Sequence, residues 1–189
     1  MTMTDGTTTL EVRLNARLAS VQRGDRYEDP LAFWIETAFP GSRVTDGGTL
    51  RSTEGEPLSC AVRADVVGDA EAIEGAVAEF LDGLGAPLGS SLVLGDRPAR
   101  GFGVQSGFGL YLDGTGLPQD VYAANDINEF IDELHARTSS HGVLQSFWEG
   151  PTETALYLYG DDATALAASI APLVDAHPLA VNARLERIA

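Results

Sequence analysis

The chain has 189 residues, and its 28 acidic residues outnumber its 12 basic residues, all of them arginine, so the formal net charge at pH 7 is −16. Proteins that bind phosphate backbones or anionic membranes need basic patches, so this acidity argues against nucleic acids and membrane surfaces as partners. It is compatible with steering toward a basic protein partner, and its alternative explanation is simple solubility.

The N-terminal segment MTMTDGTTTL lacks the basic and apolar regions of a signal peptide, and no apolar run approaches the roughly 20 residues that cross a bilayer. We therefore expect a cytoplasmic protein in which residues 1–8 form a disordered tail. The single cysteine, Cys60, excludes an internal disulfide. It lies in the apolar run LSCAVRADVV, which predicts a small buried side chain rather than a nucleophile.

The first predicted folded half covers residues 9–96 and has the order β-α-β-β-α-β. Alternation of apolar and polar residues in TLEVRLNARL predicts a strand, and DPLAFWIETAFPG predicts a helix that Asp29 caps. Two strands are expected around a turn at residues 54–57, followed by a helix that begins after Asp69 and ends at Gly85. The segment SSLVLGD closes this half as a short strand.

The second predicted half covers residues 108–189, after a glycine- and arginine-rich linker at residues 97–107. FGLYLDG predicts a strand, and Asp126 is expected to cap the helix that follows. GVLQSFW and TALYLYG predict two strands, and Asp161 or Asp162 opens the next helix. Pro172 is expected to kink or split that helix, because proline donates no backbone hydrogen bond. NARLERI predicts the last strand.

The two halves match in more than their element order. The phrase at residues 29–33 corresponds to that at residues 126–130, and Glu54-Gly55 corresponds to Glu149-Gly150. We therefore predict an α+β fold made by tandem duplication of a ferredoxin-like βαββαβ unit, with antiparallel sheets and helices on one face. Chance similarity between two α+β halves is the alternative.

The strand TALYLYG has no polar face. Simple alternation through the hairpin places Tyr157 and Tyr159 on one face together with Phe147, and Trp148 on the other face with the leucines. Because both faces are apolar or aromatic, we expect the strand to be covered on both sides and the two sheets to abut. Core packing is the first interpretation of these aromatic residues, and Trp148, Tyr157 and Tyr159 are the candidate pocket residues if they line a site instead.

Catalytic patterns are weak in this chain. The three histidines, His135, His141 and His177, have no metal-ligand spacing, and no GxSxG elbow occurs. Ser139, Ser140 and His141 are neighbours in one loop, which rarely gives a productive triad. We therefore assign no catalytic residue, no metal and no cofactor.

The segments LYLDGTGLPQDVYAANDINEFIDEL and FWEGPTETALYLYG are the basis of a resemblance to known proteins. The second half, residues 104–189, resembles small uncharacterised bacterial α+β proteins of ferredoxin-like type, some of which look like immunity proteins of toxin systems. The resemblance implies a scaffold and a protein partner, such as a toxin or nuclease, and implies no role for any single residue.

Two functional hypotheses follow. The first is an acidic, non-enzymatic binding protein of immunity or inhibitor type that masks a basic partner surface. Its candidate contacts are four acidic residues of one predicted helix and two tyrosines: Asp126, Glu129, Asp132, Glu133, Tyr111 and Tyr122. The alternative is a small-molecule-binding or catalytic protein with its site in the cleft between the halves. The oligomeric state is left open.

Overall fold

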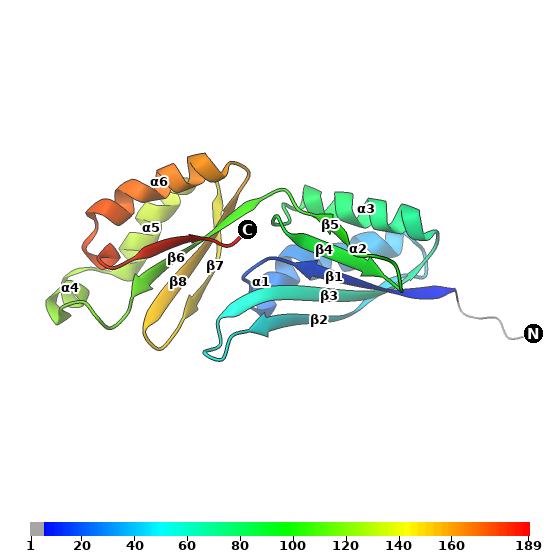
Figure 1. Cartoon of the computed structure of the whole chain (residues 1–189), viewed down its shortest axis with the longest axis horizontal. Helices are drawn as coiled ribbons and strands as arrows, with labels where there is room; N and C mark the ends of the chain where they lie inside the picture. The colour runs from blue at the N-terminus through cyan, green and yellow to red at the C-terminus, as the bar shows by residue number, and fades with distance from the viewer. Residues whose placement is uncertain (1–5) are drawn as a thin grey trace, which may run out of the picture. The chain divides into compact units, whose positions relative to one another are not determined.

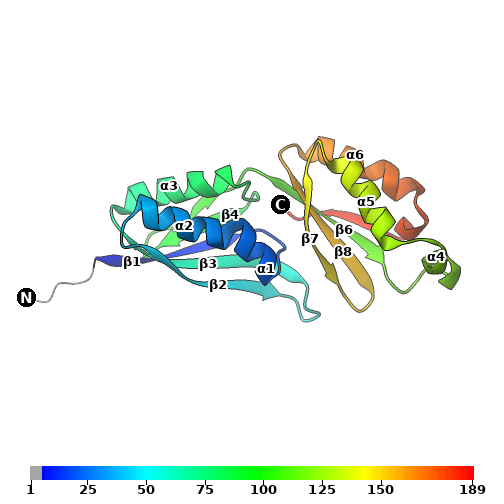
Figure 2. The same cartoon turned by 180° about the vertical axis from the view of Figure 1, so that it is seen from behind.

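The computed structural model describes residues 6–189, which divide into two compact units. The first unit runs to Leu50 and resumes at Pro57–Val104, and the second contains Arg51–Glu56 and Gln105–Ala189. Each unit has one sheet, and its long helices cover one face of that sheet (Figures 1 and 2). The prediction of an α+β fold with antiparallel sheets and helices on one face is confirmed.

The first unit contains a five-stranded sheet in the order β2-β3-β1-β4-β5. Its strands are β1 (Thr7–Leu14), β2 (Arg43–Arg51), β3 (Pro57–Val67), β4 (Ser90–Leu94) and β5 (Arg100–Phe102). β1 is the long central strand and pairs antiparallel with β3 and with β4. Alternate residues of β1, such as Leu10, Val12 and Leu14, are buried because successive side chains point to opposite faces of a strand.

One continuous helical segment follows β1, made of α1 (Ser20–Arg23), a π-helical turn η1 (Gly24–Glu28) and α2 (Asp29–Ala38). The prediction that Asp29 caps a new helix is wrong, because its backbone is already helical and its N–H donates to the carbonyl of Gly24. The π turn lies directly before Pro30, which has no N–H to donate. By contrast, Asp69 caps α3 (Ala70–Gly83) as predicted, accepting from the N–H of Ala72 at 2.9 Å.

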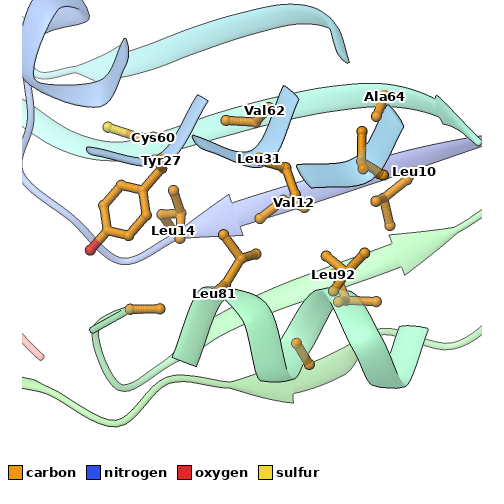
Figure 3. Packing of buried hydrophobic residues seen from close by; sticks show 14 of the residues in the cluster. Leu10, Val12, Leu14, Tyr27, Leu31, Cys60, Val62, Ala64, Leu81 and Leu92 are labelled. Carbon is orange, nitrogen blue, oxygen red and sulfur yellow. The ribbon is translucent and has the colours of Figure 1, made fainter. Parts of the chain in front are cut away.

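The core of the first unit forms where the helices meet the sheet. Figure 3 shows Tyr27, Leu31 and Leu81 from the helices among side chains that rise from β1, β3 and β4. These side chains are fully buried, and each leucine or valine among them contributes about 1.5–3 kcal/mol relative to full exposure. Cys60 is part of this core at 2% exposure, which confirms the predicted small buried side chain.

The second unit contains a four-stranded sheet in the order β7-β8-β6-β9. Its strands are β6 (Ser106–Asp113), β7 (Val143–Glu149), β8 (Glu153–Gly160) and β9 (Arg184–Arg187). Its helices are α4 (Gln119–Ala124), α5 (Ile127–Thr138), α6 (Ala163–Ala176) and the 3-10 turn η2 (Pro178–Ala180). When the strands of each unit are counted along the chain, both sheets place the second strand at one edge, followed by the third, the first and the fourth: β7-β8-β6-β9 here and β2-β3-β1-β4 in the first unit. The matching order is what a duplication would leave, and the duplication itself stays a prediction.

Several predicted boundaries need correction. β1 begins at Thr7, so the tail predicted at residues 1–8 is too long; residues 1–5 of it lie outside the described part. The linker predicted at residues 97–107 contains β5 and the start of β6, because a three-residue strand is too short to show a period of two. α6 is not split at Pro172; the residue four positions earlier, Ala168, is exposed, so water can reach its carbonyl.

The face of the second sheet opposite α5 and α6 carries a tyrosine cluster. Trp148 pairs with Ala155 and Phe147 with Leu156, so Trp148 and not Phe147 lies with Tyr157 and Tyr159. The prediction carried simple alternation of faces through the hairpin, which would put odd-numbered residues of β7 and β8 on one face. It is wrong because residues that pair across the two strands share a face, and here an odd-numbered residue of β7 pairs with an even-numbered residue of β8. β8 is buried on both faces from Ala155 to Gly160, as its sequence predicts.

Part of the tyrosine cluster is closed by the short segment Arg51–Glu56. The hydroxyls of Tyr111 and Tyr157 both donate to Oε1 of Glu56, at 2.8 and 2.9 Å. The guanidinium of Arg184 lies 3.7 Å from the centre of the Tyr111 ring. Glu56 therefore satisfies the hydroxyls of Tyr111 and Tyr157, as buried tyrosines require.

Candidate functional site

An acidic hollow of about 690 Å³ lies in the second unit, between the loop after β6 and the beginning of α5. Its lining combines carboxylates with small and apolar side chains. The residues that line it are Leu112, Asp113, Gly114, Tyr122, Ala123, Ala124, Asn125, Asp126, Ile127, Glu129, Glu149, Thr154 and Leu179. Four of these are acidic and none is basic, so the hollow has one sign of charge.

The strand directions explain why two of the acids meet here. β6 and β7 both run antiparallel to β8, so β6 and β7 are parallel to each other and end at the same edge of the sheet. Asp113 is the last residue of β6 and Glu149 is the last residue of β7. Thr154 pairs with Glu149 on the intervening strand and also lines the hollow.

Asp113 is held in place by the loop that follows it. Its Oδ1 accepts from the N–H groups of Gly116 at 2.6 Å and Thr115 at 3.0 Å, and its Oδ2 accepts from Nδ2 of Asn182 at 3.1 Å. These bonds, the Gly116 bond above all, lower the pKa of Asp113 below its usual value because they favour the charged carboxylate. Asp113 is therefore a fixed negative charge at neutral pH.

The helix α5 supplies the next two acids. Asp126 caps the helix, and its Oδ1 accepts from the backbone N–H of Asn128 at 2.8 Å. Glu129 follows in the first turn, where a carboxylate interacts favourably with the helix dipole. Both side chains are exposed, and Ile127 between them is 38% exposed. The start of α5 therefore brings two charges and one apolar side chain to the hollow.

Leu112, Tyr122, Ile127 and Leu179 form the apolar part of the lining. Tyr122 also closes the loop, because its hydroxyl accepts from the N–H of Leu117 and donates to the carbonyl of Asp113, both at 3.1 Å. The hydroxyl of Tyr122 is thus hydrogen-bonded within the protein, which leaves the ring as the part of Tyr122 that can contact a ligand in the hollow.

The charge of the chain is concentrated in the second unit. It holds 14 of the 28 carboxylates but only 4 of the 12 arginines, so its formal charge is −10. Its arginines are engaged away from the hollow. Arg51 donates to Gly55, Arg137 to Glu133, Arg184 to Glu153 and Glu186, and Arg187 to Ala189 and Ser106.

The predicted partner contacts separate into groups. Asp126, Glu129 and Tyr122 line the hollow. Asp132 is exposed on α5 outside it, and Glu133 is ion-paired with Arg137 at 2.6 Å.

Tyr111 is only 4% exposed and lies on the opposite face of the sheet from α5. Assigning Tyr111 to one surface with the acidic helix is therefore wrong, because adjacent β6 positions point to opposite faces.

The predicted pocket residues Trp148, Tyr157 and Tyr159 pack together in the tyrosine cluster, and Tyr159 also lines a smaller hollow of about 280 Å³. Tyr157 and Tyr159 are 0% and 1% exposed, and Trp148 is half-buried beside them. Sequence reasoning missed Asp113 and Glu149 as partners of Asp126. The available signal was that each ends a strand, and that the βαβ connection makes those two strands parallel.

Among residues 6–189, no three histidine, cysteine or carboxylate side chains are grouped so that they could hold a metal ion. Within the same residues no helix is long and apolar enough to cross a membrane.

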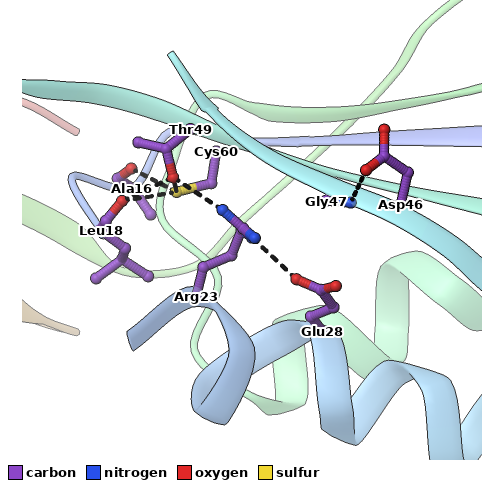
Figure 4. Close-up of polar contacts among 8 residues, drawn as sticks. All are labelled: Ala16, Leu18, Arg23, Glu28, Asp46, Gly47, Thr49 and Cys60. Carbon is purple, nitrogen blue, oxygen red and sulfur yellow. Dashed lines mark hydrogen bonds and ion pairs between the residues drawn. The ribbon is translucent and has the colours of Figure 1, made fainter. Parts of the chain in front are cut away.

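A second polar cluster lies in the first unit, where the helical segment meets β2 and β3 (Figure 4). Arg23 donates to Glu28 at 2.9 Å and to Thr49 at 3.0 Å, and Thr49 donates to the carbonyl of Leu18. The thiol of Cys60 donates to the carbonyls of Ala16 and Leu18, both at 3.4 Å. These contacts join the segment from Ala16 to Glu28 to β2 and β3, and we assign them to stability.

Comparison with known proteins gives no family. No family model matches the chain, and no curated protein matches it. Among solved structures, the crystal structure of an unknown protein from Galdieria sulphuraria is 10% identical and covers 97% of this chain and 99% of its own. Its TM-score is 0.32, which is too low to support an argument about fold or function.

Proposed function

We propose that this protein is an acidic, non-enzymatic binding protein of inhibitor or immunity type, which masks a basic surface of another protein. The observation that carries the proposal is the acidic hollow of the second unit, lined by Asp113, Asp126, Glu129 and Glu149 without a basic side chain. Charge complementarity of this kind raises association rates and selects partners.

The charge distribution supports the same proposal. An acidic surface needed only for solubility has no reason to gather in one hollow, since interspersed charges serve that purpose equally well. Here the arginines of the second unit pair with other groups, which leaves the hollow and the exposed side of α5 negative. The proposed contact surface is therefore the hollow with Asp132, and it no longer includes Tyr111.

The test uses a partner captured from host lysate by the immobilised protein, then purified and measured alone. We expect its dissociation constant to rise steeply between 50 and 300 mM NaCl, because surface charges are screened over a Debye length of about 10 Å at 0.1 M salt. Reversal of two acids, Glu129→Lys with Glu149→Lys, should weaken binding by tenfold or more. The charge-matched control is Glu36→Lys with Glu79→Lys, at two exposed positions on α2 and α3. Equal affinity of the partner for the reversal variant and the wild type would refute the proposed surface.

A small-molecule site is the second candidate, and the volume of the hollow favours it. Thermal unfolding across a metabolite panel separates the two candidates. A small ligand at a concentration 100 times its dissociation constant should stabilise the protein by about 2.7 kcal/mol. Such a ligand, together with no salt-sensitive protein partner, would favour the small-molecule site.

A further inference from the structure

We infer that the hollow receives a guanidinium group on a hydrocarbon stem, which is one arginine side chain of the basic partner. The inference deepens the proposed function, on which it depends. It names what enters the site, whereas the proposed function requires only that the partner be basic.

The first step is the two-part chemistry of the lining. Carboxylates come from three elements, at the ends of β6 and β7 and at the start of α5, and the lining also contains apolar residues such as Leu112, Ile127 and Leu179. An arginine side chain has the matching composition, because its three methylene groups pack on apolar surface while its charged end seeks acceptors. A small hydrated inorganic cation would leave the apolar lining unused.

The second step is the state of the carboxylates. Carboxylate oxygens of Asp113 and Asp126 accept hydrogen bonds from backbone N–H groups, so the positions of these two side chains are fixed. In the part of the chain that the structure describes, the side-chain carboxylates of Glu129 and Glu149 have no ion-pair or hydrogen-bond partner. Two unpaired acceptors beside two fixed charges provide separate attachment points for the five N–H donors of a guanidinium.

The third step separates guanidinium from ammonium. Tyr122 is the aromatic residue of the lining, and its hydroxyl is hydrogen-bonded within the loop. A planar guanidinium stacks on such a ring and bridges two carboxylates, whereas a lysine ammonium acts as a single point charge with a tightly held hydration shell. Arginine is therefore the better occupant.

The test titrates the full-length protein with N-acetylarginine methylamide, followed by amide chemical shifts in NMR. We expect saturable shifts centred on the N–H groups of Asn125, Glu129 and Thr154. The neutral isostere N-acetylcitrulline methylamide should produce no saturable shifts. Glu129→Gln and Glu149→Gln should each weaken binding about fivefold to tenfold, while Asp175→Asn, an exposed position of α6 outside both the hollow and the proposed contact surface, should leave it unchanged.

Three further measurements decide which kind of cation the hollow binds. N-acetyllysine methylamide should bind at least threefold more weakly than the arginine compound. Spermidine binding a hundredfold more tightly than the arginine compound would overturn the inference, because the site would then suit a free polycation. Binding of Mg²⁺ or Ca²⁺ at the same N–H groups at matched ionic strength, in preference to the arginine compound, would overturn it as well.

The two proposals fail in different ways. Equal binding of the arginine compound to wild type and to the doubly substituted Glu129→Gln, Glu149→Gln protein overturns the inference about the hollow. If the captured partner still binds in a salt-sensitive manner in that case, the proposed function stands on the remaining acidic surface. Thermal unfolding of each variant confirms that these exposed substitutions leave the fold intact.

Discussion

Single residues of the hollow differ in how firmly the fold holds them. Asp113 accepts three hydrogen bonds from its own loop and from Asn182, whereas Glu129 and Glu149 are exposed. A carboxylate that accepts several N–H groups stays ionised and immobile, and an exposed one can turn toward a ligand. The hollow therefore combines a rigid charge with adaptable ones, a combination that suits binding rather than acid–base chemistry.

The lowered pKa of Asp113 predicts a pH dependence of stability. Because the pKa in the folded state lies below the unfolded value of about 3.9, the contribution of Asp113 is present above that pH and is lost as the pH falls through the folded pKa. Asp113→Asn should lower the thermal midpoint at pH 7, and the difference from wild type should shrink toward pH 3.

The charge-matched control for this prediction is Asp120→Asn, an exposed position in the first turn of α4. It should show a smaller difference at pH 7. A difference for Asp113→Asn that is the same at pH 3 and pH 7 would contradict the ionic origin of the contribution.

Among the elements, the two long helices of the second unit each begin at an aspartate that caps the helix. Asp126 caps α5 and Asp162 caps α6, each through a carboxylate oxygen that accepts from backbone N–H groups. Such caps are local, because the acceptor and its donors lie within three residues, so the sequence predicts Asp126 as a cap and narrows the cap of α6 to Asp161 or Asp162. β5 and α4 are too short to carry a periodic signal, so the sequence does not predict them.

The cap of α6 provides a quantitative prediction for one element. Asp162 accepts from Thr164 at 2.9 Å and from Ala165 at 3.0 Å, so Asp162→Ala should reduce the free energy of unfolding by about 1 kcal/mol. The control is Asp175→Ala at the other end of α6, where removing a negative charge should be neutral or slightly stabilising. Urea unfolding measures both, and equal losses would show that the cap has no special role.

For the whole molecule, the dominant property is the net charge of −16. Net charge far from zero destabilises the compact state through self-repulsion, and salt reduces that repulsion. We therefore expect the thermal midpoint at pH 7 to rise between 10 and 200 mM NaCl. A midpoint that falls with added salt would mean that the ion pairs, such as Arg97 with Glu74, outweigh the repulsion.

The sequence by itself determines the α+β class, the order of the long elements and the caps at Asp69 and Asp126, because apolar periodicity and capping act over a few neighbouring residues; for α6 it leaves Asp161 or Asp162, and the structure selects Asp162. Only the tertiary structure decides that Trp148 lies with the tyrosines and that Glu149 joins Asp113 and Asp126 around one hollow. Both facts depend on how β7 and β6 pair with β8. Strand register is set by long-range pairing, and a shift of one residue turns every side chain of a strand to the other face.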